Sequence, residues 1–113
     1  MGRYKVLRTD TADSGLHRII LSVAENFGVE TALQKLEKIE QQLMLLEDTP
    51  YIGTDPRYMV LRRQGYKVLI LEKDLVFYKV NEEEKTVSLC GCGPERRLSE
   101  YYSGTLNFAE RLT

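Results

Sequence analysis

The sequence has 113 residues, of which 42% are hydrophobic and 29% are charged. A chain of this length buries roughly 65% of the surface that its unfolded form exposes, which is enough for one core without disulfides or metals. The 16 basic and 17 acidic residues give a net charge of -1. Proteins that grip nucleic-acid phosphates usually carry a strong basic excess. The composition therefore predicts one globular domain over residues 1–113 and no binding to free DNA.

The N-terminal residues lead directly into strand-like sequence, without the apolar segment of a secretory signal. The longest purely apolar runs are Leu43–Leu46 and Val68–Leu71, with four residues each. A membrane-spanning helix needs about 20 such residues. We expect a cytoplasmic protein that makes no membrane contact.

Cys90 and Cys92 form a Cys-Gly-Cys pair inside a strand-like run. Two cysteines this close do not suggest a disulfide framework, and a structural zinc site needs about four ligands. The single histidine, His17, falls between the apolar positions of the first predicted helix, so we expect it at the surface. We expect two reduced structural thiols, no metal and no cofactor.

The first half of the chain predicts a strand followed by a helical hairpin. Residues 3–8 are rich in strand formers, and the small oxygen-bearing side chains of residues 9–11 can cap a helix. Apolar residues then recur at helical spacing until Gly28, a residue typical of helix ends. The stripe consists of Leu16, Ile19, Ile20, Val23, Ala24 and Phe27.

A second apolar stripe begins only a few residues later, and so short a connection predicts an antiparallel pair of helices. This stripe consists of Leu33, Leu36, Ile39, Leu43 and Leu46. Asp48-Thr49-Pro50 ends the helix, because proline lacks the backbone N–H and disfavours helix in the residue before it. Residues 51–64 are predicted to form a loop, with a short extended piece at residues 58–61.

The second half of the chain changes to an extended pattern. Residues 66–71, 75–80 and 86–90 read as strands, and the short polar connections between them predict an antiparallel meander. Residues 91–94 are predicted to break the last strand, and residues 95–102 to form a short helix. Residues 104–113 are predicted as a further turn or a frayed tail. The fold class is α+β, in the order β-α-α-β-β-β-α, with the helical hairpin packed on a mostly antiparallel four-stranded sheet.

Two charged clusters could serve binding or only solvation. The acidic run Glu82-Glu83-Glu84 sits at a predicted hairpin turn, where it is expected to keep the turn soluble. A basic cluster precedes and enters the second strand, and it fits either a solvated rim or a contact surface for an acidic partner. It consists of Arg57, Arg62, Arg63 and Lys67.

The segment after the last strand combines two guanidinium groups with two phenols. Arg96 and Arg97 come five residues before Tyr101 and Tyr102, respectively. Arginine can stabilise a phosphoryl transition state, and tyrosine can stack on a base or transfer a proton. The alternative is a packing helix whose arginines lie in water, and the residues alone leave both interpretations open.

Together, the order of these elements and several local strings resemble the RelE/ParE superfamily of toxins from bacterial type II toxin–antitoxin modules. The resemblance covers roughly residues 3–103, and the hairpin of residues 75–87 is its most specific part. The strings are Tyr4-Lys5-Val6, the second helix ending in Asp-Thr-Pro, Gly65-Tyr66-Lys67-Val68-Leu69, Leu75 to Val87, Arg96-Arg97 and Tyr101-Tyr102.

The resemblance implies a small toxin that a cognate antitoxin holds inactive by wrapping its helical hairpin and sheet. RelE-like members cleave mRNA on the ribosome, and ParE-like members inhibit DNA gyrase. For the nuclease, the resemblance implies roles for Lys67, Arg96 and Tyr102 or Tyr101 as phosphate ligand, transition-state clamp and base. Arg62, Arg63, Arg97 and Tyr101 are the candidate partner-binding residues.

Two family cations of the nuclease are replaced by apolar residues, Leu69 and Leu75. In an electrostatic mechanism each such loss costs on the order of 3 kcal/mol of transition-state stabilisation, by analogy with an oxyanion hole. We therefore expect a ParE-like toxin that binds a protein such as gyrase and is not an enzyme. The alternatives are a ribosome-dependent endoribonuclease and a relic of the superfamily that has lost toxicity.

Overall fold

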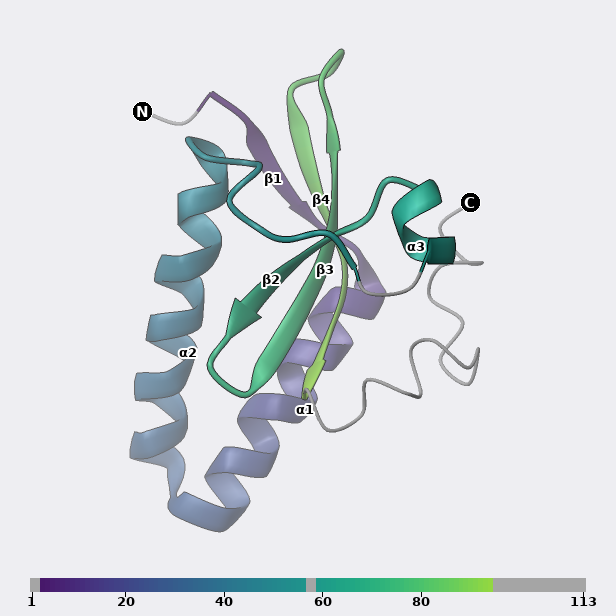
Figure 1. Ribbon diagram of the computed structural model, residues 1–113. Helices are drawn as coiled ribbons and strands as arrows, with labels where there is room; N and C mark the ends of the chain where they lie inside the picture. Colours follow the sequence, from purple (N-terminus) through teal and green to yellow (C-terminus); the bar gives the residue numbers. More distant parts are fainter. Residues whose placement is uncertain (1–2, 57–58, 95–113) are drawn as a thin grey trace.

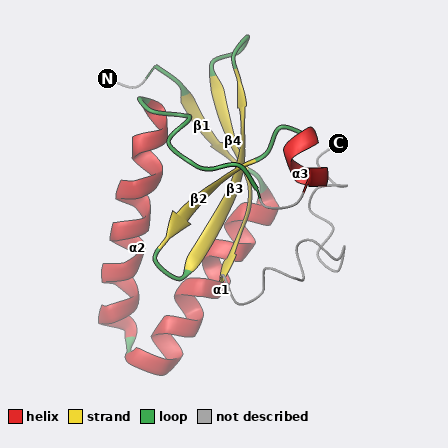
Figure 2. Ribbon diagram, in the orientation of Figure 1, coloured by secondary structure: helices red, strands yellow, loops and turns green. Residues whose placement is uncertain are grey.

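The computed structural model describes residues 3–56 and 59–94. Two long helices pack as a hairpin against one face of a four-stranded sheet (Figures 1 and 2). The α+β fold predicted from the sequence is therefore confirmed. In chain order the elements are β1 (Lys5–Arg8), α1 (Asp10–Phe27), α2 (Val29–Met44), the 3₁₀ turn η1 (Leu45–Glu47), α3 (Met59–Arg63), β2 (Lys67–Leu71), β3 (Asp74–Asn81) and β4 (Thr86–Pro94).

The sheet has the order β1-β4-β3-β2. β2, β3 and β4 form the predicted antiparallel meander, and β1 pairs in parallel with β4, from Lys5 opposite Thr86 to Arg8 opposite Leu89. The parallel pair is possible because the whole helical hairpin lies between β1 and the meander, which gives the long connection that parallel strands require. β1 and β2 are the two edges of the sheet.

The ends of the helical hairpin follow the local sequence signals. The Thr9 hydroxyl accepts a hydrogen bond from the backbone N–H of Ala12 at 3.2 Å, and it donates to the Leu89 carbonyl of β4 at 2.8 Å. Thr9 therefore caps α1 and also ties it to the sheet. Gly28, the single residue between α1 and α2, has a φ of +98°, which an L side chain rarely adopts.

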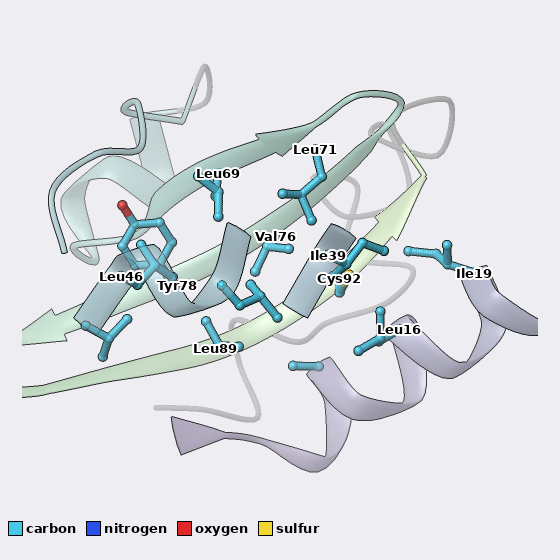
Figure 3. Close-up of a cluster of buried hydrophobic side chains, with 13 residues drawn as sticks. Leu16, Ile19, Ile39, Leu46, Leu69, Leu71, Val76, Tyr78, Leu89 and Cys92 are labelled. Carbon is cyan, nitrogen blue, oxygen red and sulfur yellow. The ribbon is translucent and has the colours of Figure 1, made fainter. Parts of the chain in front are cut away.

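The core lies between the hairpin and one face of the sheet (Figure 3). Leu16 and Ile19 of α1, together with Ile39 of α2, pack on residues that alternate along the strands. The strand residues of this cluster are Leu69, Leu71, Val76, Tyr78, Val87, Leu89 and Cys92. Residues between them point to the opposite face, because side chains alternate along a strand.

Two predictions about buried helix faces were wrong at the hairpin tip. Phe27 is 73% exposed and Leu33 is 58% exposed, although both continue an apolar stripe. Figure 1 shows that the tip of the hairpin extends past the turn between β2 and β3, and Phe27 ends α1 at this tip. No helix among the described residues is long and apolar enough to cross a membrane.

The loop before β2 differs from its prediction. The extended piece expected at residues 58–61 is replaced by the helix α3, which buries Leu61. The extended segment lies earlier instead, where Thr54 forms a two-way backbone bridge with Val68 at 2.8 Å in each direction. The sequence Met-Val-Leu-Arg-Arg contains several good helix formers, and burial of Leu61 decides in favour of the helix.

β4 also continues beyond its predicted end at residue 90 and runs to Pro94. One extra residue, Cys90, is inserted between the pairs Tyr78–Leu89 and Phe77–Gly91, which is a β-bulge. Pro94 is compatible with the strand because it is the last residue, opposite Asp74. The predicted helix at residues 95–102 and the tail at 104–113 lie outside the described residues.

Candidate functional site

Lys67, the one predicted nuclease residue within the described ranges, lies at the start of β2 with its charge already paired. Its Nζ is 3.3 Å from the Oδ1 of Asp55 and 5.7 Å from the ring centroid of Tyr51. The side chain is 25% exposed. Lys67 is opposite Tyr78, whose side chain belongs to the helix-facing core. Lys67 therefore connects the preceding loop to the sheet.

Of the predicted partner-binding residues, Arg62 and Arg63 lie in α3. The Nε of Arg62 donates to the Pro56 carbonyl at 2.7 Å, which closes the loop before the helix. Arg63 contacts the sulfur of Met59 at 3.4 Å and is exposed. Arg57, Arg96, Arg97, Tyr101 and Tyr102 lie outside the described residues.

The two replaced cation positions lie on opposite faces of the sheet. Leu69 is opposite Val76 in the helix-facing core, whereas Leu75 is opposite Ile70 and points to the other face. Both leucines are buried. A cation at position 69 would point into the apolar core beneath the helices. Positions 67, 69 and 75, which the resemblance assigns to the nuclease, therefore do not form one phosphate-binding surface.

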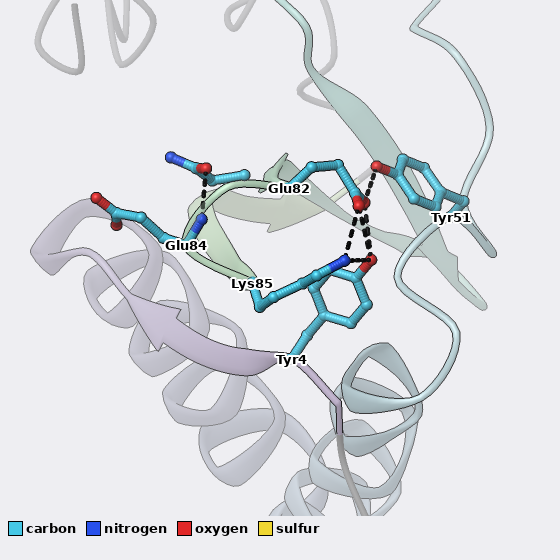
Figure 4. A network of polar contacts seen from close by, with 6 residues as sticks. Tyr4, Tyr51, Glu82, Glu84 and Lys85 are labelled. Atoms are coloured by element: carbon cyan, nitrogen blue, oxygen red, sulfur yellow. Dashed lines mark hydrogen bonds and ion pairs between the residues drawn. The ribbon is translucent and has the colours of Figure 1, made fainter.

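A polar network that sequence reasoning missed joins three distant segments (Figure 4). The Glu82 carboxylate, after β3, accepts hydrogen bonds from the phenols of Tyr4 and Tyr51; the Tyr4 contact is 2.7 Å. It also pairs with the Lys85 ammonium at 3.1 Å. The only signal for this network in the sequence was the acidic run, which was interpreted as solvating the turn; for Glu82 that interpretation was incomplete.

The network shifts the titration of its members in opposite directions. Hydrogen bonds from Tyr51, Tyr4 and Lys85 lower the pKa of Glu82 to about 2, because they stabilise its charged form. The same bond to Glu82 raises the pKa of Tyr51 to about 12, because a phenolate beside a carboxylate is disfavoured. At neutral pH the cluster therefore holds the Glu82 carboxylate, the Lys85 ammonium and the protonated Tyr51 phenol.

Two further ion pairs attach the helices to the strands. Arg8 of β1 contacts both carboxylate oxygens of Glu40 at 2.6 Å, and this hydrogen bond raises the pKa of the guanidinium. Lys35 of α2 contacts Asp74 of β3 at 2.8 Å, and Asp74 is only 3% exposed. These pairs fix the position of α2 above the sheet.

The two cysteines are free and buried, and they point to opposite faces of β4. Burial raises the pKa of the Cys90 thiol to about 11 and that of the Cys92 thiol to about 12. Such thiols are weak nucleophiles at neutral pH. Within residues 3–56 and 59–94, no group of three or more histidine, cysteine or acidic side chains is arranged to hold a metal ion.

A groove of about 350 Å³ lies between α2 and the outer edge of β2. Hydrogen-bonding side chains of α2, including Gln34, Lys38 and Gln42, form one wall, and Ile70, Leu71 and Glu72 form the other. The groove therefore combines amide and ammonium groups on its helical wall with apolar residues on its strand wall. Its residues were not predicted as a site, because no sequence pattern marks the outer strand of a sheet.

Comparison with known proteins assigns the family. A model described as the ParE toxin of the type II toxin–antitoxin system, parDE, matches residues 6–98. The chain is 31% identical to Toxin ParE3 of Caulobacter vibrioides over 87 residues, which cover 77% of this chain and 82% of that protein.

Solved structures share the fold. A chain of the chromosomal ParDE toxin–antitoxin system from P. aeruginosa superposes with a TM-score of 0.67 at 20% identity, covering 81% of this chain and 96% of that one. A mutant of the E. coli toxin RelE in the free state gives a TM-score of 0.58 at 19% identity, covering 91% and 93%. The fold of the superfamily is therefore confirmed, and the match over residues 6–98 places this chain in the ParE toxin family of type II toxin–antitoxin systems.

Proposed function

We propose that this ParE-family toxin acts by binding DNA gyrase in the bacterial cytoplasm, and that a cognate antitoxin neutralises it. The match to the ParE model over residues 6–98 carries this proposal. The charge balance agrees with a protein target, because a net charge of -1 gives little attraction to nucleic-acid phosphates.

The geometry around β2 favours ParE-like action over mRNA cleavage. The Lys67 ammonium is already paired with Asp55, and Leu69 and Leu75 are buried on opposite faces. Catalysis of phosphoryl transfer depends on cations that point together at the developing charge. These three positions do not converge on one point where a phosphate could sit.

The gyrase proposal is tested by supercoiling of relaxed plasmid with purified gyrase and toxin. We expect inhibited supercoiling or an accumulation of cleaved DNA as the toxin concentration rises. Relaxation of the same plasmid by a type I topoisomerase is the control and should not change. Normal supercoiling at saturating toxin would exclude gyrase as the target.

Cleavage of mRNA on programmed ribosomes tests the endoribonuclease alternative separately. We expect no toxin-dependent cleavage in the A site. If cleavage occurs and disappears in Arg96→Ala or Lys67→Ala, the protein is a RelE-like nuclease and the proposal is wrong. A normal growth rate after induced expression, without either activity, would instead favour a relic that has lost toxicity.

The antitoxin is sought in the adjacent open reading frame. Expression of the toxin alone should arrest growth, and expression together with the product of that frame should restore it. The solved P. aeruginosa structure is named as a toxin–antitoxin system, which supports the same expectation for this chain. Growth arrest that persists despite co-expression would exclude that product as the antitoxin.

A further inference from the structure

Strand register gathers polar side chains on the face of the sheet that points away from the helices. One row crosses β1, β4 and β3 at Leu7, Ser88 and Lys79. A second row, two residues along each strand, consists of Lys5, Thr86 and Asn81. Val6, Val87 and Val80 alternate with these rows and pack on the helix-side core, so both rows point the other way.

This end of the face is open to solvent. Along β3, Phe77 is buried, Lys79 is half-buried and Asn81 is exposed. In β1, Leu7 is 40% exposed although it is a large apolar residue. The two rows therefore form an accessible surface, which we call the polar sheet face. It consists of Lys5, Leu7, Lys79, Asn81, Thr86 and Ser88.

The polar sheet face is cationic, although the whole chain is not. Its six side chains carry two ammonium groups, two hydroxyls and one amide, and no carboxylate. Within the part of the chain that the structure describes, neither Lys5 nor Lys79 forms an ion pair. Glu82, the acidic residue that follows this face in β3, is already bonded to Tyr4 and Lys85. Both lysines can therefore accept a carboxylate from outside the described chain.

Lys79 is ordered before any partner binds. Its Nζ lies 4.5 Å from the centroid of the Tyr66 ring, which is a cation–π contact. The ring is a fixed support, because Tyr66 is only 1% exposed. A side chain that is already ordered loses less conformational entropy on binding. Two strand spacings and two residues separate Lys79 from Lys5, which corresponds to about 12 Å between their Cα atoms.

We propose that the polar sheet face is the surface with which the toxin contacts its protein target, and that it binds an acidic segment carrying two carboxylates about 12 Å apart. One carboxylate pairs with Lys5 and the other with Lys79. The hydroxyls and the amide between them can donate hydrogen bonds, and Leu7 supplies an apolar contact. Two cations release too few counterions to hold a nucleic acid, which favours a protein. The inference rests on the proposed function, in which the target is a protein.

Charge reversal tests this surface in two assays, inhibition of gyrase supercoiling and growth arrest after induced expression. Lys79→Glu and Lys5→Glu should each raise the toxin concentration that half-inhibits gyrase by about fivefold or more, because attraction becomes repulsion. Growth arrest should weaken in the same two variants. The matched control is Lys73→Glu, which should change neither assay, because Lys73 lies in the exposed turn between β2 and β3, outside the polar sheet face.

Lys79→Arg separates the binding role of this lysine from support of the fold. Arginine keeps both the positive charge and the contact with the Tyr66 ring, so this variant should inhibit gyrase within about twofold of the wild type. Urea unfolding of each variant checks that it is folded. Lys5→Glu changes an exposed residue of an edge strand, so it keeps the test valid should Lys79→Glu unfold the protein.

The outcomes separate this inference from the proposed function. If the folded Lys5→Glu and Lys79→Glu variants inhibit gyrase and arrest growth like the wild type, the surface is wrong and the gyrase target stands. If the wild type arrests growth without inhibiting gyrase or cleaving mRNA, and both variants lose the arrest, gyrase is wrong and the surface contacts another protein. Loss of arrest that accompanies loss of mRNA cleavage would assign the face to RNA and overturn the inference. A wild-type protein without either effect would overturn both.

Discussion

At the scale of single residues, Gly15 sets how closely α1 approaches the sheet. A Cβ atom added at this position would lie 1.9 Å from the carbonyl oxygen of Cys92 in β4. Glycine in the interior of a helix normally costs about 1 kcal/mol relative to alanine. Close contact between two backbones explains why the helix has glycine here, since no side chain could fit.

We therefore predict that Gly15→Ala destabilises the protein by about 1–3 kcal/mol, despite the better helix propensity of alanine. The contact is with backbone, which cannot rotate away, so α1 must move from β4. Urea unfolding measures the effect as a lower midpoint. Ser14→Ala, at the exposed neighbouring position of the same helix, is the control and should leave the midpoint nearly unchanged. An unchanged or raised midpoint in Gly15→Ala would show that the backbone contact is not limiting.

The cysteines give a second prediction at this scale. Because burial raises the pKa of Cys90 to about 11, only about one thiol in a thousand is ionised at pH 8, and Cys92 is ionised still less. Ellman's reagent at pH 8 should therefore react slowly with the native protein, and it should report two thiols after denaturation in guanidinium chloride. Rapid reaction of either thiol in the native state would contradict their burial.

At the scale of elements, the Glu82 network joins the hairpin between β3 and β4 to two other segments. Tyr4 comes from the chain before β1, and Tyr51 from the loop after η1. Backbone bonds from Arg3 and Tyr4 to the Glu47 carbonyl attach the same chain end to η1. The network therefore closes the end of the sheet at which β1 begins.

The pKa values of the network give a pH prediction whose sign can be worked out. The pKa of Tyr51 is raised to about 12, so its contribution to stability is present below pH 10 and is lost as the pH rises towards 12. The pKa of Glu82 is lowered to about 2, so its contribution is present above pH 4.5 and is lost as the pH falls towards 2. Stability should therefore be insensitive to this network across the neutral range.

Glu82→Gln tests the assignment of these shifts. The neutral amide no longer opposes a phenolate, so the pKa of Tyr51 should fall from about 12 towards the ordinary value of about 10. An NMR titration of the labelled tyrosine rings measures it. Glu83→Gln is the matched control, because Glu83 is the exposed neighbouring residue in the same turn. If the pKa of Tyr51 stays near 12 in Glu82→Gln, the Glu82 carboxylate is not the cause of the raised pKa.

At the scale of the whole molecule, the charge balance predicts whether the protein binds nucleic acid. With 16 basic and 17 acidic residues, the chain would release few counterions on binding a duplex, so it would gain little affinity in this way. We predict no retardation of a DNA duplex of about 30 base pairs by micromolar protein, even at about 50 mM salt. A salt-sensitive gel shift would contradict this prediction and would call for a basic surface that the sequence average conceals.

Much of the fold was predictable because its signals are local. The helical spacing from Leu16 onward, the stop at Gly28 and the alternation around β2 and β3 each depend on neighbours within a few residues. The local signals failed where packing between distant segments decides the structure. Examples are the helix α3, the extension of β4 past its bulge, and the exposed tip residue Phe27.

The candidate site was less predictable, since its parts come from distant segments. The resemblance to the toxin family identified Lys67, but only the pairing with Asp55 revealed that its charge is already committed. Likewise, Leu69 and Leu75 look alike in sequence, yet strand register places them on opposite faces. Glu82 meets Tyr4 across 78 residues, a distance over which no periodic pattern gives information.

By itself, then, the sequence determined the helical hairpin, the antiparallel meander, the charge balance and the resemblance to a toxin family, because these depend on residue type and short-range spacing. Only the tertiary structure decided that β1 forms one edge of the sheet beside β4 and that β2 forms the other edge, where the Ile70 side chain is 58% exposed. The physical reason is that a strand's backbone groups are the same in every sequence. Whether these groups find hydrogen-bond partners depends on which strand lies alongside, and the packing of the whole chain determines that strand.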